Sequence, residues 1–209
     1  MHIYAFGSVC RGDISINSDI DLLAIIEGLD SRFDPDNYSI YSYKRIKELW
    51  QEGNPFAWHL ALESKLLFSS DQCDYLKSLG DPASYKTCVK DCEKFYSLFR
   101  EACASLATNT TSRVFDLSTV FLSIRNIASC FSLGTIATPD FSRHSATKLG
   151  VFSINISAST YQIFERARIL CTRGSGSNIA DCEVDVAIQE SVKINEWMTI
   201  LVQEAKTYE

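Results

Sequence analysis

The chain has 209 residues, of which 46% are hydrophobic, which is enough for one sizeable core or two small domains and excludes a disordered chain. Its 20 basic and 26 acidic side chains give a formal net charge of -6, which excludes non-specific binding to nucleic acid or anionic membrane through net positive charge. We see no run approaching the roughly 20 apolar residues of a membrane span and no signal-peptide pattern, and so predict a cytoplasmic protein without membrane contact. Its eight cysteines, which include no C-x-x-C pair, are expected to be reduced and mostly buried.

The first part of the chain is predicted to consist of strands with short connections. Apolar and alternating patterns predict strands over 2–6, 20–26 and 38–43. Apolar residues at helical spacing before Gly53 predict a helix over 44–53. The stretch 56–68 fits a strand or a short helix, and its periodicity does not decide between them.

The second part shows a different pattern, with apolar residues at three- and four-residue steps. This spacing predicts four principal helices, over residues 84–106, 114–133, 160–173 and 181–208. We therefore predict an α+β protein with a small mixed β-sheet domain and flanking helices over 1–83, followed by an all-α helical bundle over 84–209.

Two acidic residues, Asp19 and Asp21, stand one residue apart in the second predicted strand. Side chains alternate along a strand, so the two carboxylates should share one face while Ile20 and Leu22 point into the core. Neighbouring carboxylates repel each other unless a cation lies between them, and an oxygen-rich site of this kind suits Mg²⁺. The pair therefore predicts a metal site for two-metal phosphoryl or nucleotidyl transfer.

A Gly-Ser pair precedes these carboxylates, where the first predicted strand ends. Gly7 would let the backbone approach a phosphate closely, and Ser8 offers a hydroxyl and an amide. A helix beginning near Val9 would direct its positive end to the same place, and Arg11 could contact a triphosphate. These residues are the candidate nucleotide-binding elements.

The segment "GSVCRGDISINSDIDLL" resembles the signature of the DNA polymerase β-like nucleotidyltransferase superfamily, in particular its minimal and antibiotic nucleotidyltransferases. The resemblance implies that a nucleoside triphosphate, with ATP expected, gives its nucleoside monophosphate to a hydroxyl acceptor and releases pyrophosphate. It implies Mg²⁺ on Asp19 and Asp21, and nucleotide contacts from Gly7, Ser8 and Ser18. The acceptor could be a small molecule such as an antibiotic, a protein or an RNA.

The resemblance also implies a third carboxylate on a neighbouring strand, and "YSIYSY" contains none. Glu63 is the favoured substitute, as a metal ligand or base, with His59 on the same face if this stretch is a strand. Asp34 and Asp36 flank a proline, where aspartate more often stabilises a turn. Without a third acid, the alternative is a non-catalytic nucleotide-binding module that regulates a toxin-antitoxin-like system.

The segment "SIRNIASCF" was compared with a second family, the HEPN ribonuclease domains. Arg125 and Asn126 are similar to the start of the HEPN motif, but Cys130 stands where that motif has histidine. RNA cleavage without this acid or base is not expected. Arg125 is then a structural arginine.

The helical half is expected to bind the acceptor or to mediate dimerisation. Arg143, His144 and Lys148 form a basic cluster that either faces the acceptor or triphosphate or is a solvated helix N-terminus. The first predicted strand has almost no chain before it, and an exposed edge there is a reason to suspect a homodimer.

Overall fold

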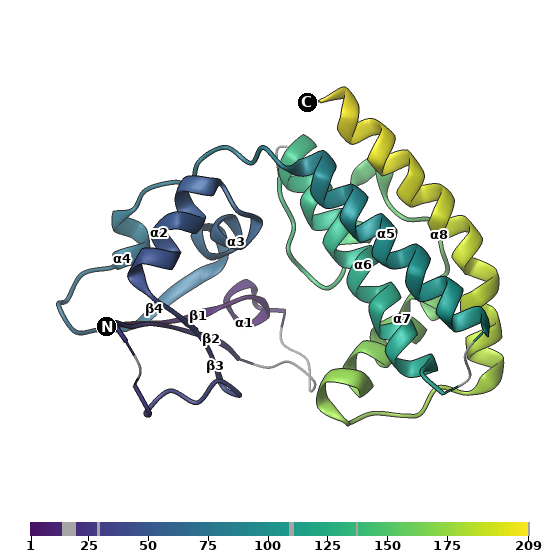
Figure 1. The fold of residues 1–209 in the computed structure, drawn as a ribbon, viewed down its shortest axis with the longest axis horizontal. Coiled ribbons are helices and arrows are strands. Elements are labelled where there is room, and N and C mark those ends of the chain that lie inside the picture. The colour runs from purple at the N-terminus through teal and green to yellow at the C-terminus, as the bar shows by residue number, and fades with distance from the viewer. Residues whose placement is uncertain (14–19, 29, 109–110, 137, 209) are drawn as a thin grey trace. The chain divides into compact units, whose positions relative to one another are not determined.

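The structure is a computed structural model that describes residues 1–13, 20–28, 30–108, 111–136 and 138–208. The chain folds into two compact units, Met1–Lys86 and Thr87–Glu209 (Figure 1). The first contains a four-stranded mixed sheet with helices, and the second is helical. The predicted α+β class is therefore confirmed.

The sheet of the first unit has the strand order β3-β2-β1-β4. Its strands are β1 (His2–Phe6), β2 (Asp21–Ile25), β3 (Tyr38–Tyr41) and β4 (Ser64–Ser69). β1 is antiparallel to both of its neighbours, whereas β2 and β3 are parallel. The expected exposed edge at β1 is therefore wrong, because β4 pairs along it, and this reason for suspecting a homodimer no longer applies.

Four helices complete the first unit, and local sequence sets where the longer ones begin. They are α1 (Ser8–Arg11), α2 (Tyr43–Glu52), α3 (Pro55–Glu63) and α4 (Tyr75–Ser78). The Ser42 hydroxyl accepts from the Arg45 amide and caps α2, so the strand predicted over 38–43 ends at Tyr41.

The ambiguous stretch 56–68 contains both of the structures that its pattern allowed. The Asn54 carboxamide caps α3, with Oδ1 2.9 Å from the Phe56 amide, and Pro55 occupies the first helical position. The chain changes from α3 to β4 between Glu63 and Ser64. Periodicity could not place this boundary because both elements are short and apolar.

The second half of strand β2, residues 23–25, is buried on both of its faces. Leu23 and Ile25 join the core beneath the helices, and Ala24 joins a smaller cluster with Phe33 on the opposite face. The prediction that Ile20 points into the core is wrong, because its side chain is 61% exposed. It precedes β2, which begins at Asp21, so strand alternation does not extend to it.

The second unit has four principal helices, with α6 the most buried among them. They are α5 (Cys88–Thr108), α6 (Arg113–Thr135), α7 (Ala158–Arg173) and α8 (Asp181–Thr207), with short 3₁₀ turns η1 (Ser145–Thr147) and η2 (Gly150–Phe152) between α6 and α7. Helix α6 packs against α5, α7 and α8. The ribbon shows these helices side by side (Figure 1).

Two expectations from composition need correction. Helix α6 is long and apolar enough to cross a membrane by length and composition, contrary to the expectation of no such stretch. Its apolar window has a mean hydropathy of 1.3 and is 67% buried inside the bundle, so packing against neighbouring helices accounts for the composition. All eight cysteines are free thiols, but only Cys92 and Cys130 are buried.

Candidate active site

A tight turn at the end of β1 forms the base of the candidate site. Gly7 has φ 76° and ψ -139°, a backbone conformation that glycine adopts readily. The Gly7 carbonyl accepts from the Cys10 amide at 3.1 Å and the Arg11 amide at 3.2 Å. These bonds form α1, which begins at Ser8, close to the predicted start near Val9.

Asp21 lies directly against this turn. The sheet register pairs Phe6 with Asp21, so the carboxylate begins β2 beside the residue at which β1 ends. A Cβ atom on Gly7 would lie 2.7 Å from Asp21 Oδ2, so any other residue here would force the Asp21 carboxylate to move. The missing side chain therefore brings a carboxylate oxygen and the turn together.

The other two polar residues of the predicted motif, Ser18 and Asp19, lie outside the described residues. Within the part of the chain that the structure describes, no group of three or more His, Cys, Asp or Glu side chains could hold a metal ion. The predicted pair of metal-binding carboxylates thus consists of Asp21, placed here, and Asp19, whose role stays a prediction.

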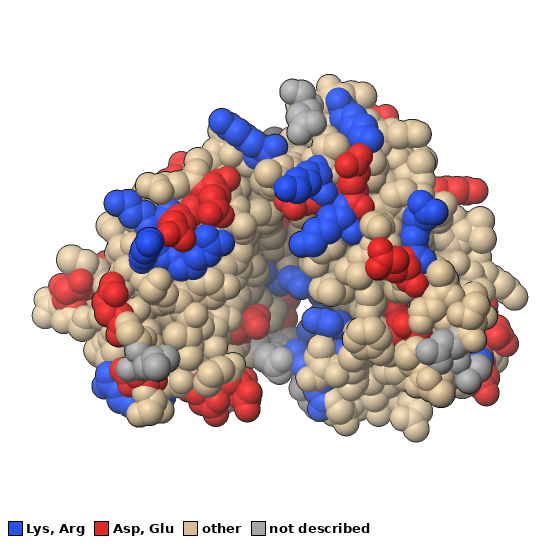
Figure 2. Space-filling view, in the orientation of Figure 1, with Lys and Arg blue, Asp and Glu red and all other residues tan. Residues whose placement is uncertain are grey.

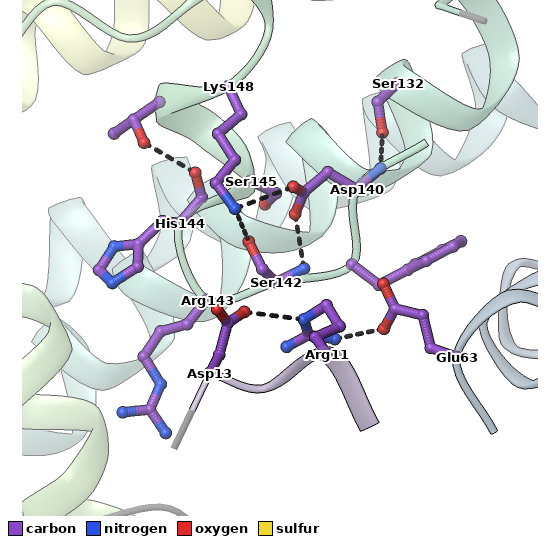
Figure 3. Close-up of polar contacts among 12 residues, drawn as sticks. Arg11, Asp13, Glu63, Ser132, Asp140, Ser142, Arg143, His144, Ser145 and Lys148 are labelled. Carbon is purple, nitrogen blue, oxygen red and sulfur yellow. Dashed lines mark hydrogen bonds and ion pairs between the residues drawn. The ribbon is translucent and has the colours of Figure 1, made fainter. Parts of the chain in front are cut away.

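Glu63 contacts the turn through both its main chain and its side chain. Its carbonyl oxygen accepts from the Gly7 amide at 3.2 Å. Its Oε2 atom forms an ion pair with Arg11 Nη1 (Figure 3). The same oxygen lies 2.9 Å from His59 Nε2. The predicted third acid is thus next to the turn, but its carboxylate contacts a guanidinium and an imidazole.

Arg11 contacts a second carboxylate in addition to Glu63. Its Nε atom lies 3.0 Å from Asp13 Oδ2. Burial by itself would lower the pKa of the Arg11 guanidinium, but Asp13 and Glu63 outweigh burial and raise it above its ordinary value. The predicted nucleotide contact is therefore a permanent cation held by two acidic side chains.

Asp13 was not among the predicted site residues, whereas His59 was predicted to share a face with Glu63. The His59 ring packs edge to face against Phe6, with ring centroids 5.6 Å apart. A signal for the pair His59 and Glu63 was present, because residues four apart share one face of a helix. Residues four apart also share one face of a strand, so the two side chains meet as predicted although this stretch is helical. Asp34 and Asp36 form the expected turn, in which the Asp36 amide donates to Asp34 Oδ1 at 3.0 Å.

Two side chains of the basic cluster are paired with acids of the second unit, and Figure 3 shows the pair of Lys148 and Asp140. Lys148 Nζ lies 3.2 Å from Asp140 Oδ2, and Arg143 Nη1 lies 3.3 Å from Glu165 Oε1. Burial alone would raise the pKa of Asp140, but contacts with Ser142 and Lys148 outweigh it and lower the pKa. These pairs tie the loop between α6 and α7 to itself and to α7, which favours a structural role.

Arg125 also has a structural contact, because its Nη2 atom donates to the Phe141 carbonyl at 3.0 Å. The space-filling view shows acidic and basic side chains interspersed on the visible surface of both units (Figure 2). This mixture agrees with the near balance of charges in the sequence.

Comparison with known families bears on the first unit alone. Residues 2–79 match the model of the nucleotidyltransferase domain family, and this match lies within the unit Met1–Lys86. Searches of curated proteins and of solved structures gave no significant match. The matched segment contains the Gly7 turn, Asp21 and Glu63. Residues 2–79 are therefore a nucleotidyltransferase domain of the polymerase β-like family.

Proposed function

We propose that the protein is a Mg²⁺-dependent nucleotidyltransferase. It transfers a nucleoside monophosphate from a nucleoside triphosphate, with ATP as the expected donor, to a hydroxyl acceptor. The observation that carries this proposal is the Asp21 carboxylate against the Gly7 turn, in a segment that matches the nucleotidyltransferase family. A phosphate approaching this turn meets backbone amides and a carboxylate that can share a cation with it.

The residues present fit a magnesium ion. Because Gly7 has no Cβ, Asp21 Oδ2 can lie directly beside the turn. Carboxylate oxygens are the ligands that Mg²⁺ prefers. Asp21, together with Asp19 from the sequence motif, would hold the metal. When bound, Mg²⁺ supplies positive charge that offsets the charge of the phosphates.

The protein's own groups bind and orient the triphosphate. Gly7 lets the backbone approach a phosphate closely, and Ser8 presents its amide and hydroxyl. Ser18 adds a hydroxyl from the motif, and Arg11 adds positive charge. The acceptor oxygen forms a bond to the α-phosphorus while the bond to the bridging oxygen breaks. Pyrophosphate leaves with that electron pair, and the acceptor hydroxyl gives its proton to water.

The helical unit is the proposed acceptor-binding or dimerisation domain. The acceptor classes are a small molecule such as an antibiotic, a protein or an RNA. A second function, a non-catalytic nucleotide-binding module, is favoured by one observation. The carboxylate of Glu63, the predicted third acid, contacts Arg11 and lies 2.9 Å from His59 Nε2.

Incubation with ATP labelled in the α-phosphate, Mg²⁺ and these acceptors tests the proposal by pyrophosphate release and label transfer. Asp21→Asn and Asp19→Asn should each lower turnover at least about 100-fold, because each removes a charge at the reacting phosphates. Asp81→Asn, the same change at an exposed position of the same unit, is the control and should leave turnover unchanged.

Two outcomes would contradict the enzyme. If ATP binds in a manner that depends on Mg²⁺ and Asp21, but no acceptor is labelled and no pyrophosphate appears, the chain is the binding module. If no nucleoside triphosphate binds, both functions are wrong.

A further inference from the structure

We propose that Glu63 is a positioning residue that fixes Arg11 and the turn Gly7–Arg11, instead of the metal ligand or base predicted from the sequence. The inference rests on the proposed function only in taking this turn as the nucleotide-binding element. The contacts within the first unit carry it. His59 orients Glu63 in the same arrangement.

The backbone of Glu63 is fixed to the turn before its side chain makes any contact. Glu63 ends α3, and the next residue, Ser64, pairs with Phe6 in the sheet. Next to this pair, the Gly7 amide donates to the Glu63 carbonyl. The Glu63 side chain therefore starts beside the turn wherever Arg11 points.

One oxygen of the Glu63 carboxylate already contacts nitrogen atoms of two side chains. Oε2 accepts from Arg11 and lies 2.9 Å from His59 Nε2. The Glu63 side chain is 13% exposed and that of Arg11 is 19% exposed, so water replaces a lost partner poorly. A metal ion or an acceptor proton at this oxygen would have to displace these contacts, whereas a positioning role keeps them unchanged.

Arg11 is held more firmly by Glu63 than by its other acidic partner. The Asp13 side chain is 54% exposed, so solvent screens its attraction to the guanidinium. The long Arg11 side chain has many rotamers, and an ion pair with a fixed partner restricts them before a phosphate arrives. Loss of Glu63 should therefore weaken nucleotide binding and leave the chemical step nearly intact.

The first test is a double-mutant cycle on nucleotide affinity, measured by calorimetry with ATP and Mg²⁺. Glu63→Gln keeps the side-chain shape and should weaken binding about tenfold, because it removes the charge that positions Arg11. Arg11→Gln should weaken binding by at least as much. The double variant should bind no more weakly than Arg11→Gln, since Glu63 acts through Arg11. Glu52→Gln, the same change in an exposed pair with Arg45, is the matched control.

A second readout does not depend on nucleotide. Hydrogen exchange should be about fivefold faster in Glu63→Gln at the amides of Cys10, Arg11 and Gly12, because the turn loses a brace. Amides of β2 serve as the internal reference. If Glu63→Gln fails to fold, Arg11→Gln removes the same ion pair and should show the same faster exchange.

The proposal is overturned if Glu63→Gln leaves both affinity and turn exchange unchanged. It is also overturned if affinity is unchanged while turnover falls about 100-fold, the result expected for a metal ligand or base. If the loss of affinity in the double variant equals the product of the two single losses, Glu63 does not act through Arg11. If wild-type protein binds no nucleotide, the proposed function fails, and the exchange measurement still decides whether Glu63 braces the turn.

Discussion

The two units differ in where their polar side chains meet. In the nucleotidyltransferase unit, side chains from β2, α1 and α3 converge on one turn that Gly7 begins. In the helical unit, polar side chains secure helix ends and one loop. Asp116 near the start of α6, for example, accepts from Ser112 and Ser105.

This difference teaches where function is encoded in the chain. A site assembled around one turn leaves a short and specific sequence pattern. A helical bundle held together by apolar packing shows only a repeat of apolar residues every three to four positions. Such a repeat predicts helices but no ligand. Substitutions in each unit test this difference.

The largest effect is expected at Gly7. Gly7→Ala would place a Cβ 2.7 Å from Asp21 Oδ2 and strain a positive-φ backbone, so nucleotide turnover should fall at least about 100-fold through misplacement of reacting groups. Gly28→Ala is the matched control, because Gly28 also has positive φ, at 70°, and no neighbour within 4 Å of an added Cβ. Equal losses of activity in the two variants would show that backbone strain, and not the approach of Asp21, is responsible.

The second effect concerns stability in the helical unit. Phe131 is fully buried in α6, so Phe131→Ala should lower the free energy of unfolding by about 3–5 kcal/mol. Phe115 on the same helix is 62% exposed, and Phe115→Ala should change it far less. Urea unfolding followed by circular dichroism measures both. Similar losses would mean that α6 is not the centre of the bundle.

The third effect is a pH dependence in the nucleotidyltransferase unit. The buried Tyr4 hydroxyl donates to Asp74 Oδ1 at 2.9 Å and accepts from the Leu76 amide at 3.0 Å. Burial, with help from Asp74, raises the pKa of Tyr4 above its ordinary value. The unfolded chain loses this proton first, so the stabilisation is complete below about pH 10 and declines as pH rises further.

Unfolding at pH 8 to 11, followed by tryptophan fluorescence, checks this. Tyr4→Phe should lower the free energy of unfolding by about 1 kcal/mol at neutral pH, because its hydrogen bonds are lost. It should also make the decline of this free energy above pH 10 shallower. An unchanged slope in this variant would assign the decline to other groups. Tyr161 in the helical unit, whose pKa burial also raises, is the first alternative.

The smallest effect is expected at the exposed ion pair of Arg45 and Glu52 on α2. Glu52→Gln should leave the unfolding midpoint and nucleotide affinity unchanged, because solvent screens exposed charges. A loss comparable with that of Glu63→Gln would show that any acid-to-amide change in this unit is harmful. Glu63 would then have no special role at the turn.

Several elements were predictable because their causes are local. Strand β1 has the predicted bounds, and α2 ends before Gly53, which adopts the left-handed conformation of a helix C-cap. The boundary between α3 and β4 was not predictable, since apolar residues suit either element and pairing with β1 decides where the strand begins.

The sequence by itself determined the family, the Gly-Ser turn and the carboxylate that follows it, because these depend on residue types at short spacing. The tertiary structure alone decided that Glu63 meets Arg11, 52 residues away, and that Asp21 lies against Gly7. Both contacts follow from the pairing of β2 and β4 with β1. The physical reason is that such pairing is fixed by burial of the whole sheet, which no short segment encodes.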